Sequence, residues 1–211
     1  MEDNCVFCRE LVGSRDTNFA RLYPEFDSRI IAETKDLVVF PCIGQLTDGH
    51  SLVITKKHYS NFAQAFNSLP DLDIQLASVI ADAHEVLAVN PDDSLYFEHG
   101  AINSDHGGCG IYHAHLHLVP KAGSVKVGSV SGFDPIIFNS LVDAYTTIKG
   151  VMPYALIGTQ KYGFGTEKLE FALPSQTIRR KVASALGSPV WDWRDAGQEQ
   201  GMIELLSRKL A

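Results

Sequence analysis

The chain has 211 residues, of which 45% are hydrophobic and 20% are charged, so it is long enough to bury a core as one domain, with or without an appendage. Its formal net charge of −7 argues against an extended nucleic-acid surface, because such a surface needs clustered lysine and arginine. No apolar run approaches the length of a membrane span, and the acidic start of the chain differs from the basic start of a signal peptide. We therefore expect a soluble cytoplasmic protein.

Four cysteines occur in the chain, which is too few for a disulfide framework at this length. Cys5 and Cys8 form a Cys-x-x-Cys pair, and such a pair in a cytosolic protein indicates metal binding or redox chemistry. Cys42 is expected to lie in the core, and Cys109 is expected to be a packed small residue.

The first half of the chain has the pattern of short strands around one long helix. β-Branched and aliphatic residues mark the strands, and apolar residues at helical spacing mark the helix, with Ser68 as its N-cap and Pro70 in its first turn. Residues 1–28 form a polar, irregular run after the cysteine pair. In chain order, the predicted elements are two strands in 29–41 separated by a turn, a strand in 50–58, a helix in 68–90 and a strand in 94–100.

The pattern changes after residue 120, and we predict a first domain of residues 1–120 with an extension, residues 121–211, packed on it. Residues 121–134 are rich in glycine and serine, which predicts a loop. The elements predicted beyond this loop are a short helix in 138–148, a hairpin in 154–173 and a helix that begins after Ser175 and ends at Gly187.

Residues 111–120 read Ile-Tyr-His-Ala-His-Leu-His-Leu-Val-Pro, so that histidines occupy every second position from 113 to 117. The aliphatic residues and the proline favour a strand, in which all three imidazoles lie on one face. Alternate Cα atoms of a strand are about 6.6 Å apart, so three histidines of one straight strand hardly converge on a single metal. The alternative is a row of surface histidines. We favour functional residues with different roles, because the row follows a glycine-rich loop directly.

These residues, together with other segments of the chain, resemble the histidine triad (HIT) superfamily of nucleotide hydrolases and transferases. The sequence His-Ala-His-Leu-His-Leu-Val is similar to the motif that defines this superfamily. Further similar segments, in the expected order, are CVFCRE at 5–10, DGHSLVITKKHYSNF at 48–62 and the glycine-rich GGCGIYHAHLHLVP at 107–120. The resemblance covers residues 5–120. It implies an α+β fold of HIT type, mainly an antiparallel sheet with a long helix, followed here by a C-terminal α/β extension.

The resemblance implies that His115 attacks the α-phosphorus of a nucleotide derivative and forms a covalent nucleotidyl-histidine, which water or another acceptor then resolves. An uncharged imidazole suits this role because histidine, with a reference pKa of about 6.5, keeps a lone pair near neutral pH. Candidate substrates are dinucleoside polyphosphates, nucleoside phosphoramidates and nucleotide sugars. The residues expected to contact phosphate or ribose are His50, Asn103, Gly107, Gly108, Gly110 and His117, the glycines through their backbone N–H groups.

In zinc-bearing members of the superfamily, the Cys-x-x-Cys pair binds a structural zinc together with two histidines. The positions implied by this resemblance are Cys5, Cys8, His58 and His113, a set that completes a tetrahedral site with no open position. The alternatives are a redox pair and two free thiols. The first triad histidine would thus bind metal, the second would attack, and the third would hold the phosphate.

One departure from the family pattern concerns the leaving group. Many relatives have Gln-Ser or Gln-Thr where this chain has Cys109 and Gly110, and the hydroxyl is thought to assist the leaving group. Glycine cannot do so, which implies a better leaving group or a donor from elsewhere. Two alternative functions stay open: a metal-dependent enzyme that uses triad histidines as catalytic ligands, and an inactive nucleotide sensor. Small relatives pair as dimers, so a homodimer is considered beside a monomer.

The extension carries two further candidate features. Gln176, Arg179 and Arg180 fall near the start of the last predicted helix, where they either meet a polyphosphate or form a basic, solvated face. The run Trp-Asp-Trp-Arg at 191–194 is either a packing anchor or a platform for a base, and packing is favoured.

Overall fold

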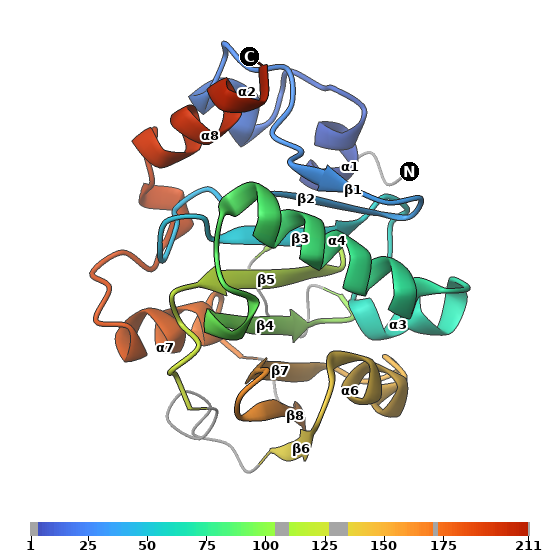
Figure 1. The fold of residues 1–211 in the computed structure, drawn as a ribbon. Coiled ribbons are helices and arrows are strands. Elements are labelled where there is room, and N and C mark those ends of the chain that lie inside the picture. Colours follow the sequence, from blue (N-terminus) through green and yellow to red (C-terminus); the bar gives the residue numbers. More distant parts are fainter. Residues whose placement is uncertain (1–3, 104–109, 127–134, 171–172, 211) are drawn as a thin grey trace.

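One antiparallel sheet organises the chain (Figure 1). In the computed structural model, which describes residues 4–103, 110–126, 135–170 and 173–210, the strand order is β1-β2-β3-β5-β4-β7-β8-β6 and all neighbours are antiparallel. The strands of this described part are β1 (Ala32–Glu33), β2 (Leu37–Pro41), β3 (Ser51–Thr55), β4 (Ser94–Gly100), β5 (His115–Pro120), β6 (Ile136–Phe138), β7 (Tyr154–Thr159) and β8 (Gly163–Lys168).

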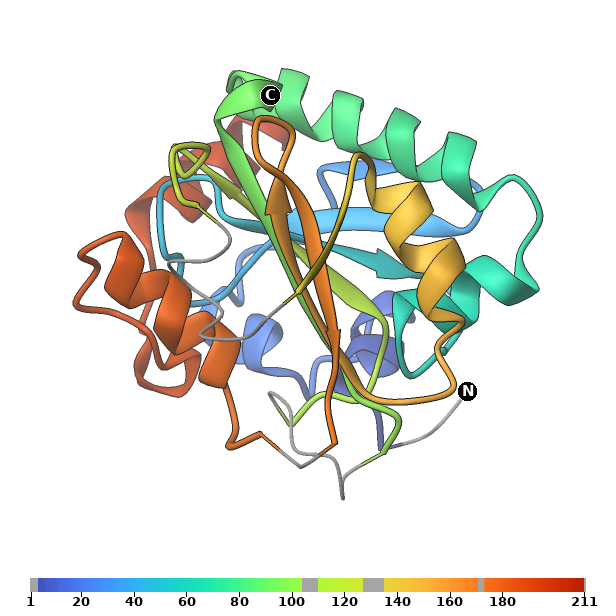
Figure 2. The ribbon, with the colours of Figure 1, turned by 90° about the horizontal axis from the view of Figure 1, so that it is seen from below.

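Helices cover both faces of the sheet. Figure 2 shows α4 and α6 together on one side and α7 on the other. The helices of the described residues are α1 (Val6–Leu11), α2 (Asn18–Leu22), α3 (Phe62–Ser68), α4 (Leu72–Leu87), α6 (Leu141–Ile148), α7 (Thr177–Ala185) and α8 (Gln200–Leu210), with 3-10 turns η1 (Pro91–Asp93) and η3 (Trp193–Asp195). None of these helices is long and apolar enough to cross a membrane. The predicted α+β class is confirmed.

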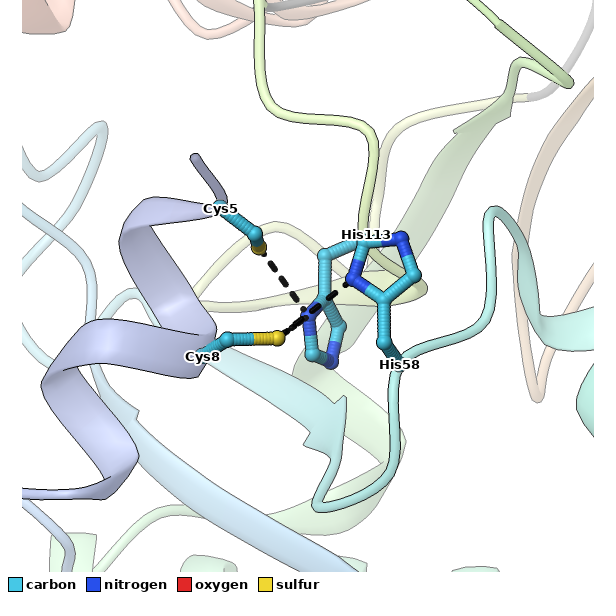
Figure 3. Close-up of side chains that lie close together, drawn as sticks. All are labelled: Cys5, Cys8, His58 and His113. Carbon is cyan, nitrogen blue, oxygen red and sulfur yellow. Dashed lines mark hydrogen bonds between the residues drawn. The ribbon is translucent and has the colours of Figure 1, made fainter. Parts of the chain in front are cut away.

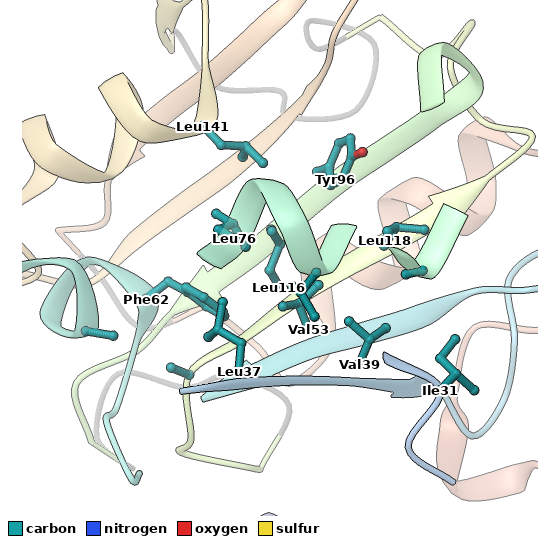
Figure 4. Close-up of a cluster of buried hydrophobic side chains, with 14 of the residues drawn as sticks. Ile31, Leu37, Val39, Val53, Phe62, Leu76, Tyr96, Leu116, Leu118 and Leu141 are labelled. Atoms are coloured by element: carbon teal, nitrogen blue, oxygen red, sulfur yellow. The ribbon is translucent and has the colours of Figure 1, made fainter. Parts of the chain in front are cut away.

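The two faces of β5 have different partners because its residues alternate in character. Ala114, Leu116 and Leu118 join the large core cluster that packs under α3, α4 and α6 (Figure 4). His115 and His117 therefore point to the opposite face. On that face Phe7 of α1 and Ile178 of α7 belong to smaller apolar clusters beside them. The functional candidates thus lie between α1 and α7.

The predicted strands of the first half are confirmed, but the predicted helix over 68–90 is partly wrong. Ser68 ends α3, and α4 begins only at Leu72 after Asp71 as its N-cap. The interruption follows from Pro70, because the residue before a proline is restricted to extended backbone. Leu69 accordingly has φ −109° and ψ 128°.

The histidine strand is shorter than predicted. β5 begins at His115, so His113 precedes it. The N–H of Ala114 donates to the carbonyl of Tyr59 at 2.6 Å and not to a neighbouring strand. The expected common side is nevertheless present, since the rings of His113 and His115 both meet Phe7 edge-on, at centroid distances of 5.8 and 5.7 Å.

Residues 121–211 add strands to the same sheet that residues 1–120 begin. The predicted hairpin is confirmed as β7 and β8, and β7 pairs with β4 along its whole length. Two predictions are corrected: Phe138 ends β6 and does not begin a helix, and Gln176, not Ser175, is the N-cap of α7. α8 lies near the C-terminus at the top of Figure 1, and its Leu205 packs in the main core.

The sequence pattern did not reveal four helices, α1, α2, α3 and α8. The first three have five to seven residues each. Isolated helices of this length are unstable in water, so they depend on packing against the sheet and leave little periodic signal. α1 matters for the site, because Cys5 is its N-cap and Cys8 lies in its first turns.

Candidate functional site

Two cysteines and two histidines from three distant segments meet at the start of α1 (Figure 3). Cys5 Sγ lies 3.3 Å from Nδ1 of His113, and Cys8 Sγ lies 3.4 Å from Nδ1 of His58 and 3.6 Å from Nδ1 of His113. The four ligand atoms all lie within 4.8 Å of one another, so the group could hold a metal ion. These are the four metal candidates that the sequence named.

The tautomer of His113 suits a metal ligand. Its Nε2 lies 2.6 Å from the carbonyl oxygen of Thr55, which can only accept a hydrogen bond. Nε2 therefore carries the proton, and Nδ1 presents its lone pair to the two sulfur atoms. Metal-bound histidines are commonly oriented by such a bond from the other ring nitrogen. Burial lowers the pKa of His113 to about 4, which keeps the ring uncharged as ligation requires.

A largely apolar pocket lies on the same face of the sheet, next to β5. Phe7 and Val6 of α1 form one wall, and Ile178 of α7 belongs to another. The remaining lining residues are Glu10, Asn18, Arg29, Cys42, Ile43, Leu52, Phe97, His99, Ile111, His115, His117, Gln176, Arg179 and Trp193. Histidines therefore line the same pocket as aromatic and aliphatic side chains, an arrangement typical of small-molecule sites.

His115 is held by the backbone of the residue two positions before it. Its Nδ1 lies 2.6 Å from the carbonyl oxygen of His113 and must donate, since a carbonyl cannot. In the uncharged ring the lone pair is then on Nε2. His115 is only 6% exposed and lines the pocket, and among the described residues it belongs to neither group of clustered cysteine and histidine ligands.

His50 and His117 form a hydrogen-bonded pair, and His117 lies next to His115. The backbone N–H of Leu46 donates to Nδ1 of His50 at 3.2 Å, so the proton of His50 is on Nε2. That nitrogen lies 2.9 Å from Nδ1 of His117, which must accept, and the proton of His117 is therefore on Nε2. The ring of Phe97 stacks on His117 with centroids 4.0 Å apart and planes at 9°. His117 is thus a fixed hydrogen-bond donor at the pocket.

Burial lowers the pKa of His50 and of His117 well below the usual histidine value. The positive charge of Arg179 acts in the same direction on both. Cys42 lies close to the pair, but this second group does not suit a metal. The two histidines already bond to each other, Nη1 of Arg179 lies 3.5 Å from the sulfur, and burial raises the pKa of the thiol.

Arg179 brings a buried positive charge from the extension to the pocket. Its guanidinium donates to the carbonyl oxygens of Trp191, at 2.5 Å, and Gly44. Among the described residues no carboxylate lies within ion-pair distance of it, although it is only 3% exposed. An anionic ligand would therefore be stabilised here. Arg180 instead lies over the ring of Trp191.

The remaining sequence candidates are less well placed. Gly107 and Gly108, with Cys109, lie outside the described residues. Gly110 is exposed with φ +84°, and Asn103 is exposed and does not line the pocket. The sequence analysis missed Phe97, and it placed His99 near the site in sequence without assigning it a role; the structure places both in the pocket lining. Both lie on β4 at alternate positions and so share its pocket face, a signal that strand periodicity could have supplied once the pocket face was known.

Comparisons with known proteins agree with this architecture. The family model described as HIT domain matches residues 23–124. "Protein hit" of Bacillus subtilis is 28% identical over 129 residues, which cover 57% of this chain and 73% of that protein. An uncharacterized HIT-like protein of Mycoplasma genitalium is 30% identical over 122 residues, 56% of this chain and 73% of that protein.

Among solved structures, a HIT family protein from Bacillus anthracis is 25% identical, with 71% of this chain and 91% of that chain covered and a TM-score of 0.41. The antiparallel sheet, with three alternating histidines that begin just before its strand β5 and continue on it, defines a histidine-triad class of α+β protein. With the sequence matches to its relatives, the chain belongs to the HIT family.

The burial of His50 and His117 predicts that acid destabilises the protein. Their folded pKa values lie below the unfolded value of about 6.5, so the unfolded state binds more protons and stability is lost as pH falls below about 6.5. Each ring contributes up to about 1.4 kcal/mol per pH unit in that window. Urea denaturation at pH 5 to 8 should show this slope. It should be shallower in the His50→Gln/His117→Gln double variant; an unchanged slope would contradict the assignment.

Proposed function

We propose that the protein is a nucleotide hydrolase or nucleotidyltransferase that acts at the α-phosphate of a nucleotide derivative through a covalent nucleotidyl-histidine on His115. The substrate is a dinucleoside polyphosphate, a nucleoside phosphoramidate or a nucleotide sugar. The single observation that carries the proposal is the hydrogen bond from Nδ1 of His115 to the carbonyl of His113, which assigns the lone pair of the uncharged ring to Nε2. Membership of the HIT family, whose members bind small nucleotide ligands, supports it.

The reaction has two displacements at phosphorus. In the first, Nε2 of His115 forms a bond to the α-phosphorus while the bond from phosphorus to the leaving group breaks. In the second, water or another acceptor forms a bond to phosphorus, the nitrogen–phosphorus bond breaks, and the acceptor loses a proton. Splitting one hard displacement into two is the usual advantage of nucleophilic catalysis.

Other side chains of the pocket would stabilise the charge on the phosphoryl oxygens. The Nε2–H of His117 is a fixed donor, since its other nitrogen accepts from His50. The buried charge of Arg179 adds a favourable potential without a carboxylate beside it. Such preorganised groups supply a large part of phosphoryl-transfer catalysis. Asn103 and the backbone amides of Gly107, Gly108 and Gly110 stay part of the proposal as phosphate or ribose contacts.

The apolar part of the pocket offers space for the nucleoside. Phe7, Ile43, Leu52 and Ile111 line it. We propose that residues 1–120 carry the chemistry and that the extension, residues 121–211, shapes the pocket through Gln176, Ile178 and Trp193. The proposed substrate is a small molecule and not an extended nucleic acid, in keeping with the net charge of −7. A cytoplasmic location and assembly as a homodimer stay part of the hypothesis.

The cysteine and histidine group is proposed to hold a structural zinc ion through Cys5, Cys8, His58 and His113. Two sulfur and two imidazole ligands are a usual tetrahedral donor set for zinc, and four protein ligands leave no position for substrate. Bound zinc would link α1 to His113, whose carbonyl oxygen orients His115.

A second candidate function, an inactive nucleotide sensor, is favoured by one observation. Gly110 replaces the residue whose hydroxyl assists the leaving group in many relatives. Such a sensor would bind nucleotides in the same pocket without forming the covalent intermediate. A metal-dependent enzyme with His115 and His117 as catalytic ligands is less favoured. Among the described residues, His115 belongs to neither group of clustered cysteines and histidines, and Nδ1 of His117 already accepts a hydrogen bond from His50.

The covalent intermediate gives a direct test. Wild-type protein is incubated with radiolabelled nucleotide derivatives, and the reaction is quenched without acid. The protein should then retain nucleotidyl label. The His115→Ala variant should retain none and should lose on the order of 10³-fold or more in turnover, since the nucleophile is gone. His84→Gln is the control, because His84 is buried away from the pocket against Ser94 and should keep the label. Label that persists in His115→Ala, or turnover without label, would contradict the proposal.

Metal analysis tests the zinc proposal. Elemental mass spectrometry of purified wild-type protein should find one zinc per chain. Cys5→Ser and His58→Ala should lose the zinc, because each substitution removes a ligand. Cys42→Ser and His115→Ala are matched controls that should keep it. Zinc retained in Cys5→Ser, or lost in His115→Ala, would show that the metal is bound elsewhere.

A further inference from the structure

His99 is a histidine of the pocket to which neither the metal group nor the attack on phosphorus gives a role. It follows Phe97 on β4 at an interval of two residues, so both side chains share the pocket face. β4 pairs with β5 so that Phe97 is opposite His117. The β4–β5 pairing ends there, but His99 lies two residues beyond Phe97 and His115 two residues before His117, and both line the pocket.

The ring of His99 has an unsatisfied nitrogen. It lines the same pocket as His115 and His117, and Nε2 is buried without a hydrogen-bond partner in the described part of the chain. Most buried polar side-chain atoms of folded proteins have a partner, and an exception at a pocket calls for an explanation, of which a catalytic role is one. By contrast, both ring nitrogens of His50 and Nδ1 of His117 have hydrogen-bond partners.

The family pattern leaves the assistance of the leaving group without its usual residue in this chain. Gly110 has no side chain to assist the leaving group, and within the described part of the chain a Cβ built on it would meet only Nη2 of Arg194, at 3.5 Å. Arg194 is therefore the competing candidate. Its guanidinium lies 3.4 Å from the carboxylate of Asp192 and 3.3 Å from the hydroxyl of Ser175, and it is not among the residues that line the pocket.

From these observations we infer that His99 gives a proton to the leaving group when His115 attacks. This inference rests on the proposed nucleotidyl transfer and adds a second histidine to its chemistry. Burial lowers the pKa of His99 to about 4, and His115 acts in the same direction. The bound anionic substrate acts in the opposite direction, because an opposite charge nearby favours the protonated ring, and His99 takes up its proton as the substrate binds. The proton moves from Nε2 to the leaving-group atom as its bond to phosphorus breaks. In the second displacement, the uncharged His99 accepts a proton from the attacking water.

The leaving group decides whether such a donor is needed. An alkoxide leaves poorly without a proton, whereas p-nitrophenolate is stable as an anion. A general acid should therefore matter for a nucleoside 5′-(methyl phosphate) and hardly at all for the corresponding 5′-(p-nitrophenyl phosphate). A purely structural role of His99 would affect both substrates alike.

The test compares these two esters of AMP, GMP or UMP, with the base that the wild-type protein accepts. His99→Gln should lower kcat/KM about 100-fold or more for the methyl ester, the usual contribution of a general acid, and change it little for the p-nitrophenyl ester. His99→Asn should repeat this selectivity. Arg194→Gln is the matched control and should leave the ratio of the two substrates unchanged.

Three outcomes would overturn the inference: equal losses on both esters, no loss on either, or the selective loss appearing in Arg194→Gln. Failure of the proposed function looks different, because no ester would then label His115 in the wild-type protein. The adduct assay is therefore run first on the same preparation. Unchanged melting temperatures of the variants exclude a general loss of folding as the cause.

Discussion

The hydrogen bond from Nδ1 of His115 to the carbonyl oxygen of His113 is the interaction on which the rest of the site depends. It decides which nitrogen of the central histidine carries the lone pair. The same His113 presents its own ring to Cys5 and Cys8, with the tautomer set by Thr55. One residue therefore joins the orientation of the candidate nucleophile to the anchoring of α1, through its backbone and its side chain respectively.

The position of β5 explains why histidine rings are tolerated in the interior. The strand lies between β3 and β4, and Leu116 and Leu118 fill the main core on its other face. Burying imidazoles is favourable only when their nitrogen atoms are bonded and the rings stay uncharged. Leu46, His50 and His117 meet this condition with a directed series of hydrogen bonds. Nε2 of His99 is buried without a hydrogen-bond partner among the residues that the structure describes, which distinguishes its ring from theirs.

Much of the sheet could be predicted from the sequence because its strands have a strong local signal. The central strands and the β7–β8 hairpin are examples, and the four-residue metal group was named through the family resemblance. The start of β5 and the helix α1 depend on tertiary contacts that local patterns do not contain, whereas the break at Pro70 has a local cause that the sequence does carry. The convergence of Arg179 and His99 on one pocket likewise required the pairing of β4 and the packing of α7, which no spacing along the chain encodes.

The tautomer of His115 is the most direct test of this account. Long-range proton–nitrogen correlation spectra of protein labelled with ¹⁵N-histidine distinguish protonated from unprotonated ring nitrogens, and loss of one signal set in His115→Asn assigns the residue. At neutral pH the account predicts a proton on Nδ1 of His115 and none on Nε2, with the opposite arrangement in His117. A proton found on Nε2 of His115 with Nδ1 bare would remove the lone pair from the proposed point of attack and contradict the account.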